Sequence, residues 1–225
     1  MIEIERENII KLYQKRYGSY GYSPKSLLWD KGKQDIRFDI LTSFYNLKYK
    51  SILDIGCGFG DLNRILYRKF GDYNYLGIDL VEDLINKAKE LYARPNIKFI
   101  TGEFLEYDFF QKFDYIIASG IFNYKMKHVN NYTYIESIIN KAMEITIDGV
   151  AFDFLSDKVD YKYEDTFHSS PEKILNIAYK YSRNIILRND YMPFEFSVFI
   201  FKDDSFAKED TLFSRYKILK GMEDK

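Results

Sequence analysis

Residues 50–62 read KSILDIGCGFGDL, and this stretch decides the fold. Apolar residues at positions 52, 53 and 55 indicate a strand that is buried in a parallel sheet. Asp54 lies near the end of that strand, and alternating glycines follow it before a helix begins. Glycine allows a tight turn and lets the backbone approach a ligand closely. The stretch therefore predicts a ligand-binding turn at the edge of an α/β sheet.

Two kinds of ligand compete for this turn. A dinucleotide-binding turn has the form G-x-G-x-x-G and places a pyrophosphate at the helix N-terminus. Here the pattern is G-x-G-x-G, with Asp54 two residues before the first glycine, Gly56. A carboxylate at that point would repel a pyrophosphate but would attract a cationic ligand. The pattern therefore favours a cationic ligand.

Asp54, Gly56, Gly58 and Gly60 match the form D-x-G-x-G-x-G. In this the chain resembles the class I S-adenosylmethionine-dependent methyltransferases, and the resemblance extends over about residues 34–202. It implies an α/β fold, a doubly wound, mostly parallel seven-stranded sheet of order 3-2-1-4-5-7-6 with strand 7 antiparallel and helices on both faces. It also implies S-adenosylmethionine as cofactor, with S-adenosylhomocysteine as product.

Hydrophobic periodicity predicts the other elements within a single domain. That domain comprises an N-terminal helical lid (1–46), a Rossmann-like core (47–202) and a charged tail without chemistry (203–225). Alternation in 194–202 indicates an antiparallel edge hairpin, whereas a dehydrogenase would need a second substrate domain. Helices are predicted at 2–17, 34–45, 62–70, 84–91, 134–145 and from 171, and further strands at 73–79, 96–100, 113–118, 150–154 and 184–188.

Several residues beyond the first motif are predicted to bind the cofactor. Asp79 follows Gly60 by 19 residues, where a carboxylate accepts hydrogen bonds from a ribose diol, although a dinucleotide site would place an acid similarly. The resemblance places Leu80 on the adenine face, and Arg37 on the carboxylate of the cofactor's methionine. The alternative interpretation of Arg37 is an ordinary surface arginine. The resemblance further implies that Glu103 and Phe104 contact the adenine and that Ser119 borders the methionine portion of the cofactor. It also places Cys57 in the cofactor-binding turn, although the simpler interpretation of Cys57 is a small side chain among glycines.

Methyl transfer from a sulfonium needs mainly alignment and desolvation, because the methyl group is already activated. A hydroxyl acceptor must also lose a proton, most simply to a histidine. The chain has two histidines, and His128 and His168 are the predicted bases. An amine or thiol acceptor would need no base. The signature [DN]-P-P-[YF] is absent from the strand end at 119–124, which disfavours methylation of adenine or glutamine amino groups.

Composition narrows the class of partner. The net charge is −1, so no overall charge attracts the protein to nucleic acid or anionic lipid. The single cysteine rules out an intrachain disulfide, and no paired acids suggest a metal site. No apolar run of about 18 residues is present. We therefore predict a cytoplasmic enzyme that methylates a small molecule, with O-methylation favoured and a sugar or nucleotide-activated metabolite as candidate. Neither nucleic acid nor membrane is an expected partner, and the oligomeric state is open. The alternatives are an RNA or protein methyltransferase and a non-catalytic cofactor-binding subunit.

Overall fold

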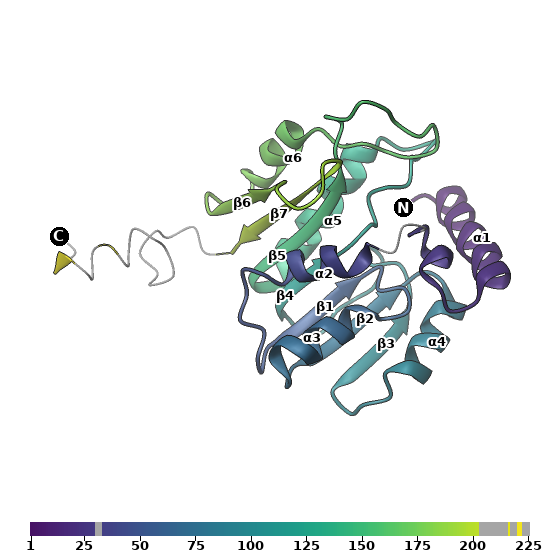
Figure 1. Ribbon diagram of the computed structural model, residues 1–225, viewed down its shortest axis with the longest axis horizontal. Helices are drawn as coiled ribbons and strands as arrows, with labels where there is room; N and C mark the ends of the chain where they lie inside the picture. The colour runs from purple at the N-terminus through teal and green to yellow at the C-terminus, as the bar shows by residue number, and fades with distance from the viewer. Residues whose placement is uncertain (30–32, 203–215, 217–219, 222–225) are drawn as a thin grey trace.

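The computed structural model describes residues 1–29, 33–202, 216, 220 and 221, so nearly all of the predicted tail lies outside the described residues. A seven-stranded sheet forms the centre, with helices on both faces (Figure 1). Its strands are β1 Ser51–Ile55, β2 Asn74–Asp79, β3 Ile97–Thr101, β4 Phe113–Ala118, β5 Thr146–Leu155, β6 Ile185–Arg188 and β7 Glu195–Phe201. The helices are α1 Glu3–Tyr20, the short 3-10 helix η1 Pro24–Leu27, α2 Gln34–Leu41, α3 Leu62–Phe70, α4 Glu82–Leu91, α5 Asn131–Ile145 and α6 Pro171–Ala178.

The strands follow the order β3-β2-β1-β4-β5-β7-β6. Strands β1 to β5 pair in parallel, and β7 runs antiparallel to both β5 and β6. This confirms the predicted fold class, including the antiparallel strand that the alternation near the C-terminus indicated. Because the parallel strands all end at one edge, the loops that follow them meet there.

Alternate side chains of each strand serve two separate layers of the core. Leu53 and Ile55 of β1 pack with the apolar faces of α5 and α6. Ile52 precedes Leu53 and therefore points to the opposite face, where it packs with α2, α3 and α4. Figure 1 shows α2 and α3 in front of the sheet and α5 behind it. Both faces of the parallel strands are therefore buried, which explains their nearly continuous apolar sequences.

The boundary between α5 and β5 differs from the predicted one. The Asp148-Gly149 pair is a strong local turn signal, yet α5 passes directly into β5 at Thr146. Thr146 Oγ1 donates to the carbonyl of Gly149 at 2.8 Å. A Cβ at Gly149 would lie 2.9 Å from the carbonyl oxygen of Ile200, so the glycine permits close pairing with β7. Pairing between strands thus overrides the turn propensity.

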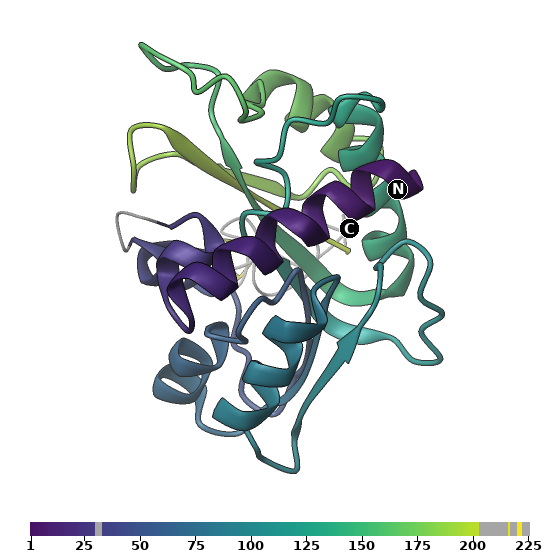
Figure 2. The same ribbon diagram turned by 90° about the vertical axis from the view of Figure 1, so that its right-hand side faces the viewer.

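Helix α1 lies at the edge of the sheet rather than on one of its faces. Figure 2 shows it running diagonally across the side of the molecule that faces the viewer. It continues three residues beyond the predicted end at Tyr17, to Tyr20, and is followed by η1. None of the helices in the described part of the chain is both long and apolar enough to cross a membrane.

Candidate functional site

The glycine turn after β1 has the backbone that its sequence predicts. Gly56 and Gly60 have φ values of 67° and 75°, a region that favours glycine. A Cβ on Gly56 would lie 2.3 Å from Ile121 Cγ2, so the loops after β1 and β4 approach closely. The N–H groups of Gly56 and Cys57 both donate to the carbonyl of Ile78. The turn is therefore fixed against the ends of β2 and β4.

A cavity of about 1060 Å³, part of it open to solvent, lies beside this turn. Nine predicted cofactor residues line it: Asp54, Gly56, Cys57, Gly58, Asp79, Leu80, Glu103, Phe104 and Ser119. Residues that precede β1 close its other side: Met1, Ile9, Tyr13, Leu27, Trp29, Gln34 and Phe38. The structure thus brings most of the predicted site together, and it adds the N-terminal segment. Gly60, Arg37 and both histidines are not part of the lining.

Asp54 is a buried carboxylate, only 4% exposed, at the end of β1. Tyr75 donates a hydrogen bond to its Oδ2 at 2.7 Å. The pKa of Asp54 is raised to about 7, mainly by burial and also by the negative charges of Asp79 and Asp153, while the hydrogen bond from Tyr75 opposes the shift. Near neutral pH this group is therefore partly protonated, and a cation in the cavity would hold it ionised.

Asp79 ends β2 and holds the turn in place. Its Oδ2 accepts from the N–H of Gly58 at 2.8 Å, and its Oδ1 accepts from the N–H of Val81 at 2.9 Å. Burial raises the pKa of this carboxyl, and these backbone bonds oppose the rise. A carboxylate has about four acceptor positions, so two bonds leave it able to accept others from a ligand.

Glu103 is buried at the adjoining side of the cavity. Its carboxylate forms ion pairs with the N-terminal amine of Met1 and with Arg6, whose Nη1 lies 3.3 Å from Oε2. Both cations belong to the segment that contains α1. Glu103 therefore connects that segment to the loop after β3, and its predicted contact with adenine stays a prediction.

Arg37 lies on α2 next to the cavity but points into a different set of contacts. Its Nε donates to Glu195 Oε2 at 2.6 Å, and its Nη2 donates to the other carboxylate oxygen. The guanidinium also lies 3.6 Å from the centre of the Trp29 ring. Arg37 and Glu195 are 5% and 2% exposed. In this arrangement the guanidinium is engaged by Glu195, so its predicted pairing with the cofactor's carboxylate receives no support from the geometry.

The two histidines lie in loops outside the cavity lining. The backbone N–H of His128 donates to Glu5 Oε1 at 2.7 Å. The ring of His168 is occupied on both sides, since Nδ1 donates to the carbonyl of Ser156 at 2.7 Å and Nε2 lies 3.1 Å from Thr166 Oγ1. A catalytic role for either histidine stays a prediction.

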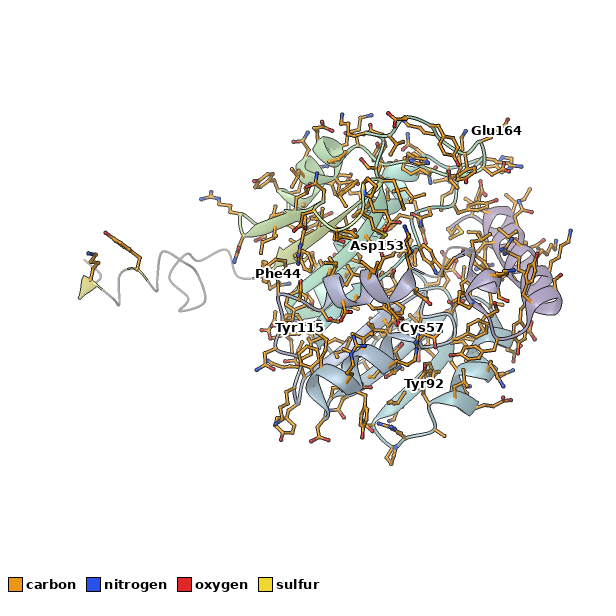
Figure 3. All side chains as sticks on the ribbon, in the orientation of Figure 1. Phe44, Cys57, Tyr92, Tyr115, Asp153 and Glu164 are labelled. Carbon is orange, nitrogen blue, oxygen red and sulfur yellow. The ribbon has the colours of Figure 1, made fainter. Side chains whose placement is uncertain are left out.

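Two further residues at the cavity are not among the predicted cofactor-binding or catalytic residues, although the sequence left core packing and a substrate-side wall equally open for Trp29. Asp153 of β5 accepts hydrogen bonds from Ser119 Oγ and from the N–H of Gly120. Trp29 packs so closely on Gly120 that a Cβ there would lie 2.5 Å from the indole. Figure 3 shows Asp153 and Cys57 toward the middle of the molecule, in contrast to Glu164 at its periphery. An acid inside the apolar run of β5 was the signal that could have identified Asp153.

The charges of the cavity suit a cationic ligand. Asp54, Asp79 and Glu103 line it, while its described lining contains no lysine, arginine or histidine side chain. Among the described residues no group of three or more His, Cys, Asp or Glu could hold a metal ion. The positively charged sulfur and the amino group of S-adenosylmethionine fit this set of acceptors.

Comparison with known proteins agrees with this geometry. Residues 52–140 match the family model of a methyltransferase domain. "Putative methyltransferase Rv1506c" of Mycobacterium tuberculosis is 27% identical over 158 residues, which are 68% of this chain and 93% of the relative. The malonyl-[acyl-carrier protein] O-methyltransferase of Priestia megaterium is 29% identical over 50% of this chain and 39% of its own length.

Solved structures share the fold at lower sequence identity. The magnesium protoporphyrin IX methyltransferase of Synechocystis PCC 6803 with bound S-adenosylhomocysteine has a TM-score of 0.64 and 14% identity, covering 89% of this chain and 99% of that one. The DhpI complex with S-adenosylhomocysteine has a TM-score of 0.66 and 13% identity, covering 86% and 95%. Residues 52–140 thus form a methyltransferase domain, and the chain has the Rossmann-like fold, the sheet order and the glycine turn of the class I S-adenosylmethionine-dependent methyltransferases.

Proposed function

We propose that this methyltransferase acts on a small neutral molecule and transfers the methyl group to a hydroxyl oxygen. The observation that carries the proposal is the composition of the cavity. One side consists of the motif residues after β1 and β2, and the other consists of the N-terminal segment, with Tyr13, Leu27 and Trp29. A site covered in this way suits an acceptor small enough to enter beneath α1, and the bound ligands would displace water from the reacting atoms.

In this proposal the cofactor binds along the lining that contains the motif residues. Asp79 accepts hydrogen bonds from the ribose, Leu80 contacts the adenine, and Asp54 faces the positive end of the methionine portion. When bound, the cofactor supplies a methyl group that needs no further activation. The protein then has to position the acceptor, exclude water and receive a proton.

The nature of the acceptor follows from the remaining side chains of the lining. Trp29, Ile121 and Tyr124 supply aromatic and apolar surface, and Gln34 supplies an amide. The described lining offers no lysine, arginine or histidine side chain to pair with a carboxylate or a phosphate, and the N-terminal amine of Met1 is already paired with Glu103. An acidic acceptor, such as the malonyl group in the name of the Priestia relative, would therefore face Asp54 without compensation. A free sugar hydroxyl or a phenol fits better than a nucleotide-activated metabolite.

The first test is cofactor binding. Calorimetry should show binding of S-adenosylmethionine and S-adenosylhomocysteine, and no tighter binding of NAD. Asp79→Ala should weaken both, whereas Asp72→Ala, at an exposed acid just before β2, should leave them unchanged. Tighter binding of NAD would contradict the assignment of the cofactor.

The second test identifies the acceptor. Methyl-labelled S-adenosylmethionine is incubated with the wild-type enzyme and separate fractions of small metabolites, RNA and protein. We expect label in small neutral metabolites, in a form that resists mild alkali as an ether does. Label in RNA or protein, or in an alkali-labile ester, would contradict the proposed acceptor class.

A further inference from the structure

Asp153 of β5 and Ser119, which directly follows β4, lie side by side. Ala118, the last residue of β4, pairs with Phe152 of β5, and the next residues along the chain are Ser119 and Asp153. Ser119 Oγ donates to Asp153 Oδ2, and Asp153 Oδ1 accepts from the N–H of Gly120 at 2.6 Å. Ser119 lines the cavity, whereas Asp153 lies behind it and is 2% exposed. The serine hydroxyl therefore stands between the cavity and a buried carboxylate.

Several charged groups act on Asp153. Arg37 of α2 favours its ionised form, while Asp54 of β1 and Tyr191 interact with it as further acidic groups. Glu195 of β7 shares the guanidinium of Arg37. Burial raises the pKa of Asp153, and Arg37, Ser119 and Gly120 oppose that rise. Three neighbours therefore support the ionised form of Asp153. Burial nevertheless gives this carboxylate a greater affinity for a proton than an exposed aspartate has.

We infer that Ser119 and Asp153 together receive the proton of a hydroxyl acceptor, an inference that rests on the proposed function. The acceptor oxygen forms a bond to the methyl carbon as the carbon–sulfur bond breaks, and that electron pair stays on sulfur. The acceptor's proton passes to Ser119 Oγ, and the serine's own proton passes to Asp153 Oδ2. Ser119 is the catalytic residue of the pair, and Asp153 acts through it.

Other candidate bases near the cavity are engaged elsewhere. Both oxygens of Asp79 accept backbone N–H groups of the turn, and the carboxylate of Glu103 forms ion pairs with the α1 segment. Asp54 accepts the Tyr75 hydroxyl and faces the cofactor's positive charge in the proposed binding mode. The histidines lie outside the lining. Among the described lining residues, Ser119 donates its hydroxyl to the buried carboxylate of Asp153, whereas the hydroxyl of Tyr124 is hydrogen-bonded to Glu5 of α1.

The chain offers a matched control pair at the opposite edge of the sheet. There Ser51 Oγ donates to Asp114 Oδ2 at 2.6 Å, and the N–H of Ser51 donates to the same oxygen at 2.7 Å. This pair has the same chemistry but lies at the amino ends of β1 and β4. Ser51→Ala and Asp114→Asn therefore report what loss of a serine–aspartate pair does to folding alone.

The experiment compares Asp153→Asn, Ser119→Ala and Ser119→Thr with the two controls. Turnover is measured as transfer of label from S-adenosylmethionine to the small-metabolite fraction, and binding is measured with S-adenosylhomocysteine. Loss of a general base typically costs a factor of about 10²–10⁴, so Asp153→Asn and Ser119→Ala should lower kcat at least about 100-fold. Ser119→Thr, which keeps the hydroxyl, should recover much of the rate. Asp153→Asn should change S-adenosylhomocysteine affinity less than about threefold, because Asp153 lies behind the cavity lining.

The pH profile separates a proton acceptor from a structural residue. Wild-type kcat should rise with pH as Asp153 ionises, and Asp153→Asn should remove that rise. Unchanged turnover in Asp153→Asn, an unchanged pH profile, or an equal loss of S-adenosylhomocysteine binding would overturn the inference. A wild-type enzyme that binds the cofactor but methylates no small metabolite would instead refute the proposed function, and this inference with it.

Discussion

Replacing Asp54 with asparagine should make the free protein more stable and the cofactor complex weaker. Asp54 is buried, and its folded-state pKa of about 7 lies above the ordinary value of 3.8. The folded state therefore holds a proton on this group between these two pH values, where the unfolded state has already lost it. The stability of the free protein must consequently fall as pH rises through that window.

The magnitude follows from the size of the shift. Each pKa unit corresponds to about 1.36 kcal/mol, so the ionised carboxylate of Asp54 costs roughly 4 kcal/mol above pH 7 and nothing below about pH 4. Asparagine has nearly the same shape, and its amide oxygen can still accept the hydrogen bond from Tyr75. Asp54→Asn should therefore stabilise the free protein by up to about 4 kcal/mol at pH 8, with the gain vanishing toward pH 4.

Urea unfolding of the cofactor-free protein at several pH values measures this gain. Asp114→Asn is the matched control of opposite sign, because hydrogen bonds from Ser51 and Lys50 hold the pKa of Asp114 below its ordinary value despite partial burial. Its substitution should cost stability at neutral pH. If Asp54→Asn destabilised the free protein at pH 8, or if its effect did not depend on pH, the assignment of an uncompensated buried charge would be refuted.

Three further predictions concern groups around the same edge. Glu195→Gln should cost about 3–5 kcal/mol in urea unfolding because it leaves a buried guanidinium unpaired, whereas Asp35→Asn, in an exposed ion pair, should cost less than about 1 kcal/mol. Asp79→Ala should weaken S-adenosylhomocysteine binding in calorimetry by about 1.5–3 kcal/mol, the range for a hydrogen bond to a charged group, and no change would remove its assigned role. Replacing both His128 and His168 with Asn should leave the rate of methyl transfer within about twofold of the wild-type rate, because neither histidine lines the cavity. A loss of about 100-fold would instead identify a histidine as the base.

Local pattern was sufficient to predict the glycine turn and the position of the acid after β2. Asp54 and the glycines that follow it are close in sequence, so their spacing alone predicts the turn, and Asp79 follows at a distance set by one helix and one strand. The antiparallel ending was predictable because alternation near residue 198 is typical of an edge hairpin. These features depend on few long-range contacts.

Contacts between distant segments could not be predicted in the same way. Arg37 and Glu195 are 158 residues apart in the sequence, and only the packing of α2 against the first residues of β7 brings them together. Gly149 carries a turn signal that fails because its neighbour across the sheet determines its conformation. The Ser119–Asp153 contact was only partly predictable. The predicted sheet order places β4 beside β5, but the register that brings these two residues together is a property of the folded sheet.

The buried acids at this edge are better explained by ligand binding than by folding. Asp54, Asp79 and Asp153 are contributed by three different strands, burial raises the pKa of each, and Asp54 is further perturbed by the other two. Such a cluster lowers the stability of the free protein, and a cationic ligand offsets the cost. Because the sulfur of the product is neutral, the part of this compensation that the sulfonium supplies is lost after transfer. Ionisation of Asp54 should therefore make the preference for S-adenosylmethionine over S-adenosylhomocysteine increase as pH rises through about 7, and Asp54→Asn should abolish that dependence.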